Sequence, residues 1–328
     1  MANITLENSN SMQFELWQEC NNRCVYCFLR EDNKKTEDSV KLESLKRTYE
    51  IICNPDNYPT HNVIGFIGGE FFQGQLKDPD VRLWFYKVMS KTAELYNNRT
   101  IQQVWIPATL NIGNQQDLYQ VLDLFNDHDD VWIITSWDSM GRFKTDKMFE
   151  TWDFHMKNLH NKYPGLKFNI TTILTGDFIE KYLDDKISLK NMMDEYHAHF
   201  FFKQCGLFAN KASESTLEEQ MESKLASNEV LANFFPKRKT FLKFLIKFKR
   251  EESEDMWNRL FNIKFRANEL YRNHNDGRTE MNRRYKDTKS EVEDSMITDC
   301  GHPMVYRAYI DSDECVLCDK ERLSLYDV

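Results

Sequence analysis

Short apolar runs alternate with longer amphipathic stretches over the first two thirds of this 328-residue chain. Six runs rich in Val, Ile and Phe are expected to be strands, namely Met12–Leu16, Val63–Ile67, Gln103–Pro107, Val131–Ser136, Leu166–Leu174 and Ala198–Lys203. Four of the intervening stretches are expected to be helices, namely Val40–Ile52, Val81–Tyr96, Gln115–Phe125 and Lys147–His160. Alternating strands and helices form α/β proteins, so we expect a parallel barrel or sheet.

The composition changes after residue 210. From Lys211 to about Ser295 there is one Pro and one Gly, and we find no strand pattern. The run FLKFLIKF at 241–248 has apolar positions at helical spacing, so this segment is expected to be a helical insertion. The last 30 residues are again rich in cysteine. The expected organisation is an α/β domain over 1–210, a helical, net-basic segment over 211–298 and a small cysteine-bearing module over 299–328.

Charge is distributed unevenly along the chain. The net charge is -9, yet residues 237–289 contain 16 Lys and Arg against 8 Asp and Glu, a net of +8. Aromatic residues interleave with these basic residues: Phe241, Phe244, Phe248, Trp257 and Tyr271. Such a segment either contacts a nucleic acid, with the aromatic rings stacking on bases, or is a solvated helix with a buried aromatic stripe. The sequence leaves both interpretations open.

The sequence also bears on the cellular compartment. No run approaches the roughly 18 consecutive apolar residues of a membrane span. The polar opening MANITLENSNS lacks the charged start and apolar core of a signal peptide. We therefore expect a cytoplasmic protein without membrane contact, in which thiols stay reduced. A dense cysteine cluster then indicates metal binding or redox chemistry rather than disulfides.

Three of the eight cysteines lie just after the first expected strand, at Cys20, Cys24 and Cys27. Iron–sulfur clusters and zinc sites normally take four protein ligands, so three thiolates leave one coordination position open. An open position is useful where another molecule must bind the metal. The alternative is a structural zinc site, for which this cluster lacks a fourth ligand.

The spacing CxxxCxxC, with Tyr26 before the last thiol, resembles the signature of the radical SAM superfamily. The sequence Gly68-Gly69-Glu70, after the second expected strand, matches the GGE motif of that family. The resemblance covers about residues 12–205 and implies a partial (β/α)6 barrel. It also implies that the three cysteines hold a [4Fe-4S] cluster whose fourth iron binds S-adenosylmethionine. The two glycines would let the backbone approach the cofactor, and Glu70 would accept a hydrogen bond from its ammonium group.

The same resemblance suggests further cofactor contacts. The segment IITSWDS at 133–139 resembles the fourth-strand segment that contacts the ribose, and IPATLNIG at 106–113 resembles the third-strand segment. The matching positions are Ser136 and Asp138 for the ribose, Asn111 in the third segment, Tyr26 against the adenine, and either Arg142 or Lys144 for the cofactor carboxylate.

The tail contains a second cysteine group, at Cys300, Cys315 and Cys318. Its arrangement resembles a shortened auxiliary-cluster region of SPASM and twitch-type radical SAM enzymes. That resemblance implies a second iron–sulfur cluster, with Cys205, His302 or a substrate atom as the fourth ligand. The alternative is a structural zinc ion bound by the three thiolates and His302.

The resemblance implies an enzyme that receives an electron from a flavodoxin or ferredoxin-type donor. It would cleave S-adenosylmethionine to a 5'-deoxyadenosyl radical, which abstracts hydrogen from a carbon of the substrate. The substrate class stays open between a peptide or amino-acid-derived group and a modified base carried on a nucleic acid. The alternative is a non-catalytic iron–sulfur or zinc module that binds nucleic acid or senses redox state, and the GGE motif argues against it.

Overall fold

A computed structural model of the chain describes only part of its residues. These are 11–22, 24, 35–58, 62–111, 115–138, 142–143, 145–204, 238–253, 256, 269–273 and 279–282. Several predicted site residues lie outside them, namely Tyr26, Cys27, Lys144, Cys205, Cys300, His302, Cys315 and Cys318. The expected module over 299–328 also lies outside the described residues.

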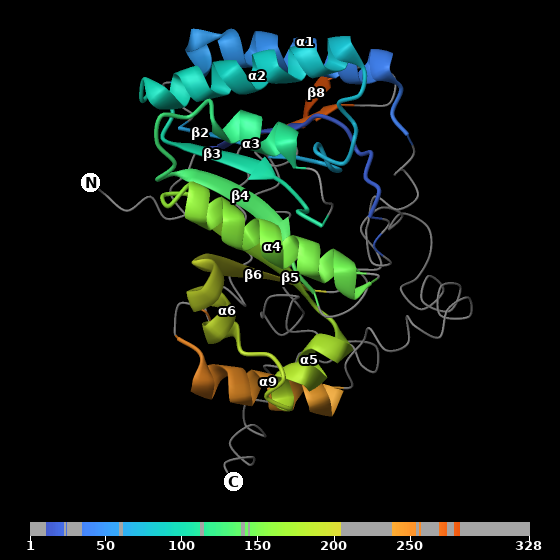
Figure 1. Ribbon diagram of the computed structural model, residues 1–328, viewed down its shortest axis with the longest axis vertical. Coiled ribbons are helices and arrows are strands. Elements are labelled where there is room, and N and C mark those ends of the chain that lie inside the picture. The colour runs from blue at the N-terminus through green and yellow to red at the C-terminus, as the bar shows by residue number, and fades with distance from the viewer. Residues whose placement is uncertain are drawn as a thin grey trace.

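All six expected strands are confirmed. They are β1 (Ser11–Glu15), β2 (Val63–Ile67), β3 (Gln103–Pro107), β4 (Val131–Ser136), β5 (Lys167–Leu174) and β6 (Ala198–Gln204). Each pairs in parallel with the strand before it, so the spatial order follows the chain order (Figure 1). These six strands form the all-parallel part of an open sheet in an α/β protein, an arrangement compatible with a partial barrel.

The four expected helices are also confirmed, with two more after β5. The α-helices described are α1 (Asp38–Cys53), α2 (Pro79–Asn97), α3 (Gln116–Leu122), α4 (Asp146–Lys162), α5 (Gly176–Leu183), α6 (Leu189–Tyr196) and α9 (Arg238–Glu251), with a short 3-10 helix η2 (Pro55–Asn57). Figure 1 shows α1 and α2 packed together at the β1–β2 end of the sheet, and α5 with α9 at the β6 end. No helix among the described residues is both long and apolar enough to cross a lipid bilayer.

Helix starts are marked by side-chain caps. The Asp78 carboxylate accepts hydrogen bonds from the backbone N–H groups of Asp80 and Val81 at the start of α2. The hydroxyls of Thr145, Thr175 and Ser188 begin α4, α5 and α6 in the same way. These caps satisfy backbone donors that have no partner within the helix, which fixes where each helix begins after its strand.

The two faces of the sheet differ. Phe14 and Phe66 lie on a fully buried face, where the Trp152 indole of α4 donates a hydrogen bond to Thr135 Oγ1 of β4 at 3.1 Å. Because side chains alternate along a strand, the other residues of β4 point to the opposite face. That face is only half-buried along β4. The helix-covered face is therefore the core, and the opposite face is the more open one.

Two further strands lie in the segment expected to be helical. β7 (Glu269–Asn273) pairs in parallel with β1, and β8 (Thr279–Asn282) pairs antiparallel with β7. The expectation of a purely helical segment over 211–298 is therefore wrong for these residues. The sequences ELYRN and TEMN are short and largely polar, so they lack the apolar alternation that marks a strand. β8 forms the edge of the sheet, where short, polar strands are common, and β7 lies between β1 and β8.

The helix expected over 241–248 is confirmed as part of α9. Two of its aromatic residues form a stripe that packs into the hydrophobic core. Phe244 and Phe248 are fully buried, with ring centroids 5.2 Å and 5.7 Å from that of Tyr182 in α5. Lys247 Nζ donates to the carbonyl oxygens of Tyr182 and Leu183 at the end of α5, at 3.1 Å and 3.0 Å. The interpretation of Phe244 and Phe248 as base-stacking groups is therefore wrong.

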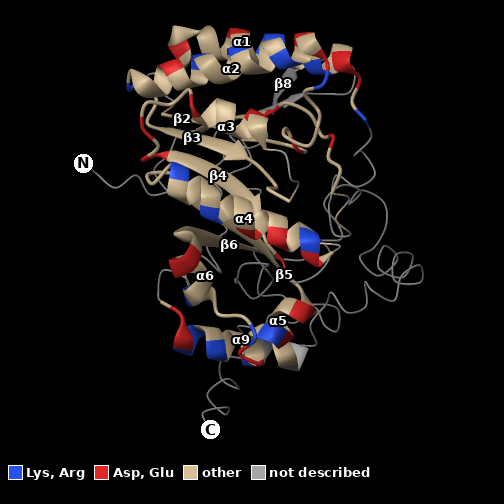
Figure 2. Ribbon diagram, viewed as in Figure 1, with Lys and Arg blue, Asp and Glu red and all other residues tan. Residues whose placement is uncertain are grey.

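The charged side of α9 is mixed rather than uniformly basic. Lys243, Lys249 and Arg250 are exposed, and Arg250 pairs with Glu251 at 3.2 Å. Figure 2 shows Lys and Arg interspersed with Asp and Glu on the other helices as well. The side chains of Phe241 and Tyr271, and all of Trp257, lie outside the described part of the chain.

Replacing Phe244 by Ala tests the buried stripe of α9. The Phe244 ring contacts aromatic rings of both α5 and α9, so its removal should lower the free energy of unfolding by about 3–5 kcal/mol. The matched control, Lys243→Ala, removes an exposed side chain of the same helix and should change stability by less than about 0.5 kcal/mol. Urea unfolding followed by circular dichroism measures both. Equal, small effects would show that α9 is not docked through this stripe.

Candidate functional site

The predicted site residues follow the carboxyl ends of four neighbouring strands. The described residues 16–22 and 24 follow β1, 68–76 follow β2, 108–111 follow β3, and 137, 138 and 142 follow β4. Because these strands are parallel and adjacent, the four segments meet at one edge of the sheet. In open α/β sheets, ligands bind outside this edge.

Backbone hydrogen bonds join the segments that follow β1 and β2. The N–H of Gly69 donates to Trp17 O at 2.9 Å, and the N–H of Glu70 donates to Glu19 O at 2.8 Å. The Trp17 indole N–H donates to Glu70 O at 2.9 Å, so a side chain reinforces the same seam. These bonds hold the GGE segment against the residues that lead directly into Cys20.

The two glycines make this close approach possible. A Cβ at Gly69 would lie 2.1 Å from Glu19 O, and one at Gly68 would lie 2.4 Å from Trp17 O. Gly68 also has a φ of 123°, which residues with a side chain rarely adopt. In this structure the glycines admit the neighbouring backbone. The expected approach to a cofactor stays a prediction.

Glu70 is buried and joins the segments that follow β2 and β3. Its Oε1 accepts hydrogen bonds from the N–H groups of Phe71 and Phe72, both at 3.0 Å, and its Oε2 accepts from the N–H of Thr109 at 2.7 Å. Burial raises the pKa of Glu70, and these hydrogen bonds act in the opposite direction. Glu70 therefore holds the GGE segment in place, a role that the sequence did not reveal.

A network of carboxamides joins the same three segments. Gln73 Nε2 donates to Asn22 Oδ1 and to Thr109 Oγ1, both at 2.9 Å, and lies 3.2 Å from Asn111 Oδ1. Asn111 Nδ2 donates to Asn22 Oδ1 at 2.9 Å. The predicted cofactor residue Asn111 is thus buried within this network. Gln73 and Asn22 were not predicted as site residues, although Asn22 lies between the cysteines.

Two of the three motif cysteines are described, and the fold places them in this site. Cys24 is buried and Cys20 is half-buried. Burial raises the pKa of the Cys20 thiol to about 12, and the backbone N–H of Asn22, by hydrogen bonding to the sulfur, partly offsets this. Weaker contributions come from the charges of Glu70 and Cys24, which raise the pKa, and of Arg142, which lowers it. The charges of Cys24 and of two other predicted site residues, Glu70 and Arg142, therefore act on the Cys20 thiol.

The segment after β4 contributes a carboxylate, of Asp138, and a guanidinium group, of Arg142. Asp138 is buried, and its Oδ1 accepts a hydrogen bond from the backbone N–H of Arg142 at 3.2 Å. Its Oδ2 lies 3.4 Å from Arg142 Nε, so the two side chains form an ion pair. Ser136, at the end of β4, is half-buried. Of the two basic candidates for the cofactor carboxylate, Arg142 lies near Cys20, and Lys144 lies outside the described residues.

An ion pair between the buried Lys41 and the half-buried Glu19 joins the residue before Cys20 to α1. Lys41 Nζ of α1 lies 2.8 Å from Glu19 Oε2 and 3.3 Å from Asp38 Oδ1. Glu19 Oε2 also accepts a hydrogen bond from the Thr36 N–H at 3.2 Å. Glu19 precedes the first cysteine, and its partners lie just before α1 and in its first turn. No spacing in the sequence indicates this pair, because Lys41 and Glu19 are 22 positions apart.

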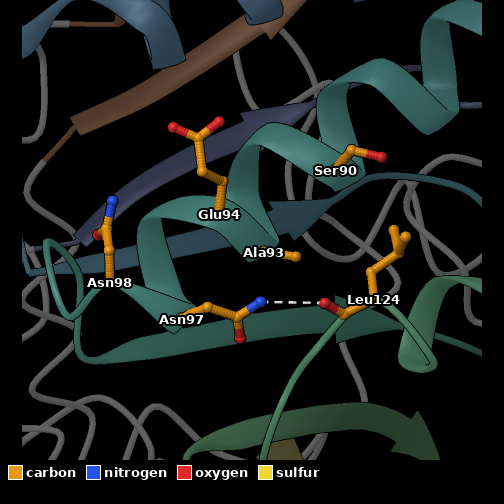
Figure 3. A pocket seen from close by; sticks show the side chains of 6 residues that line it. All are labelled: Ser90, Ala93, Glu94, Asn97, Asn98 and Leu124. Carbon is orange, nitrogen blue, oxygen red and sulfur yellow. Dashed lines mark hydrogen bonds between the residues drawn. The ribbon is translucent and has the colours of Figure 1, made fainter.

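A separate pocket of about 450 Å³ lies on α2 and is shown in Figure 3. Its lining includes Glu94, Asn97 and Leu124, and Asn97 Nδ2 donates to Leu124 O at 3.1 Å. The end of α2 leads into the start of β3, so this pocket lies toward the opposite edge of the sheet from the cysteines. Its one ionisable side chain is Glu94. We therefore do not assign it a chemical role.

The described residues contain part of the expected metal-binding set. No group of three His, Cys, Asp or Glu side chains among them could hold a metal ion. Cys27, the third cysteine of the motif, lies outside these residues, so a three-thiolate site is not tested. Cys20 and Cys24 supply two neighbouring sulfur donors, which fits the chemistry of an iron–sulfur cluster.

Comparisons with known proteins do not assign the chain to a family. No protein-family model matches the chain, and no curated protein matches it. The interpretation of the site therefore rests on its motifs and its geometry.

Replacing Gly69 by Ala tests the seam between the segments after β1 and β2. The new Cβ would meet the backbone of Glu19, which cannot turn aside as a side chain can, so unfolding should become easier by about 3 kcal/mol. The control is Gly65→Ala, within β2 itself, where the nearest atom belongs to the Trp105 ring at 2.9 Å. That change should cost about 1 kcal/mol, because the ring can shift. Denaturant unfolding of both variants measures the difference, and a reversed order would contradict the proposed seam.

Proposed function

We propose that the chain is a radical SAM enzyme. It reductively cleaves S-adenosylmethionine to a 5'-deoxyadenosyl radical, which abstracts hydrogen from a carbon of its substrate. The observation that carries the proposal is the meeting of the cysteine segment, the GGE segment and the segment after β4 at one edge of a parallel sheet. Cys20 there lies close enough to Cys24, Glu70 and Arg142 for their charges to influence its pKa.

Each site residue that the structure describes has a proposed role in binding the cluster or the cofactor. Cys20 and Cys24, with Cys27, would hold a [4Fe-4S] cluster, which supplies the electron that cleaves the cofactor. Glu70 would accept from the cofactor ammonium group, and Arg142 would pair with the cofactor carboxylate. The ribose would contact Ser136, at the end of β4, and Asp138, just after it. Asn111, after β3, would make a further contact with the cofactor.

The chain's own contribution to this chemistry is to hold these groups in place before the cofactor arrives. The cysteine segment is fixed by backbone bonds from Gly69 and Glu70 and by the Lys41–Glu19 ion pair. Rigid placement lowers the cost of ordering the reacting groups. The raised pKa of Cys20 means that this thiol must lose its proton when iron binds.

The basic segment bears on the choice between the two substrate classes. A nucleic-acid-borne base is supported by its net charge of +8 and its interleaved aromatic residues, and two of the latter, Phe244 and Phe248, are buried in the core. We therefore favour a peptide or amino-acid-derived group as the substrate. The tail cysteines, as an auxiliary cluster or zinc site, and the flavodoxin or ferredoxin-type donor remain part of the proposal.

The central test replaces Cys20, Cys24 and Cys27 together by Ala. Anaerobically reconstituted and reduced wild-type protein should cleave S-adenosylmethionine slowly to deoxyadenosine and methionine even without substrate, and the triple variant should not. Liquid chromatography of the products measures this. Deoxyadenosine formed equally by both proteins would contradict the proposal, and formation by neither would favour the alternative of a non-catalytic metal module.

A second test concerns Glu70. A hydrogen bond between its carboxylate and the cofactor ammonium should be worth about 1.5–3 kcal/mol, so Glu70→Gln should weaken cofactor binding about ten- to a hundredfold. Calorimetry measures the affinity, and iron content shows whether the cluster is still assembled. The control is Glu94→Gln on the exposed side of α2, which should leave the affinity unchanged. An unchanged affinity in Glu70→Gln, with the cluster intact, would remove Glu70 from the cofactor site.

A further inference from the structure

Asn22, between two cysteines of the motif, has a buried amide donor that no described residue pairs with. Its side chain is 4% exposed, and its Oδ1 accepts hydrogen bonds from Gln73 Nε2 and Asn111 Nδ2, both at 2.9 Å. Among the described residues, nothing accepts a hydrogen bond from its Nδ2. The preceding residue, Asn21, is the opposite case, because it is exposed and its Nδ2 donates to Gln73 O at 3.1 Å.

A buried N–H donor without a hydrogen bond is energetically costly. Buried polar side chains nearly always have a partner, from protein, water or a bound group. Two accepted hydrogen bonds hold the oxygen of the Asn22 amide toward the segments that follow β2 and β3. The amide therefore cannot rotate to offer its Nδ2 elsewhere without losing both bonds. Its donor stays fixed in the segment that carries the cysteines.

The neighbouring groups indicate what that partner is. The backbone N–H of Asn22 already hydrogen-bonds to the Cys20 sulfur, so this residue lies directly beside one proposed ligand. Cys24, the second proposed ligand, is two positions further along. The sulfurs of an iron–sulfur cluster carry negative charge and accept hydrogen bonds from N–H groups.

We propose that Asn22 Nδ2–H donates a hydrogen bond to a sulfur of the cluster held by the motif cysteines, and that this bond raises the reduction potential of the cluster. The inference rests on the proposed function, because it needs the cluster. Reduction adds negative charge to the cluster, so a donor stabilises the reduced form more than the oxidised form. Asn22 thus makes the cluster easier to reduce through a direct hydrogen bond.

The test compares two neighbouring asparagines in the full-length, anaerobically reconstituted protein. Asn22→Leu keeps a similar side-chain size and removes the buried donor, whereas Asn21→Leu makes the same change at the exposed, already paired position. Electron paramagnetic resonance during a redox titration gives the midpoint potential of each. We expect Asn22→Leu to disfavour reduction about tenfold, a shift of about 59 mV to more negative potential for one electron. Asn21→Leu should match the wild type.

Each outcome decides a different claim. A wild-type protein that holds no cluster overturns the proposed function and this inference with it. A wild-type cluster whose potential is unchanged in Asn22→Leu, or changed equally in Asn21→Leu, overturns this inference alone. If Asn22→Leu does not assemble the cluster, Asn22→Asp replaces it, since its oxygen can still accept from Gln73 and Asn111. Loss of the donor and the added negative charge both lower the potential in that variant, so an unchanged value there also overturns the inference.

Discussion

The backbone seam between the segments after β1 and β2 is the contact on which the rest of the site depends. Two hydrogen bonds, from Gly69 N–H to Trp17 O and from Glu70 N–H to Glu19 O, bring these segments together beyond the ends of their strands. Only residues without a Cβ at positions 68 and 69 fit there. The seam sets the position of Cys20 relative to Glu70, and both follow from the same backbone geometry.

Buried polar groups around this seam are held by bonds that cross between segments. The Glu70 carboxylate is bonded by N–H groups from two loops, and Gln73 links the segments after β1, β2 and β3. A buried carboxylate or amide is costly unless it is paired, so each of these bonds favours one arrangement of the loops over the others. The site is therefore organised by the protein before any cofactor binds, which is the arrangement that favours catalysis.

The sequence predicted the sheet well because its signals are local. Apolar runs such as Val63–Ile67 located all six strands of the parallel sheet, and their order follows from the alternation with helices. The site was predicted only at the level of motifs. The Lys41–Glu19 pair and the contact of Gly69 with Glu19 depend on residues that are distant in the chain, so no spacing reveals them. The strands β7 and β8 were missed because their short, polar sequences lack the apolar alternation that marks a strand.

Mössbauer spectroscopy of the wild-type protein, reconstituted with isotopically enriched iron, tests the central claim most directly. The account predicts the spectrum of a [4Fe-4S] cluster in which one iron has no cysteine ligand. Adding S-adenosylmethionine should then change the signal of that one iron and leave the others as they were. A protein that binds zinc in place of iron, or a cluster whose spectrum does not respond to the cofactor, would contradict the account.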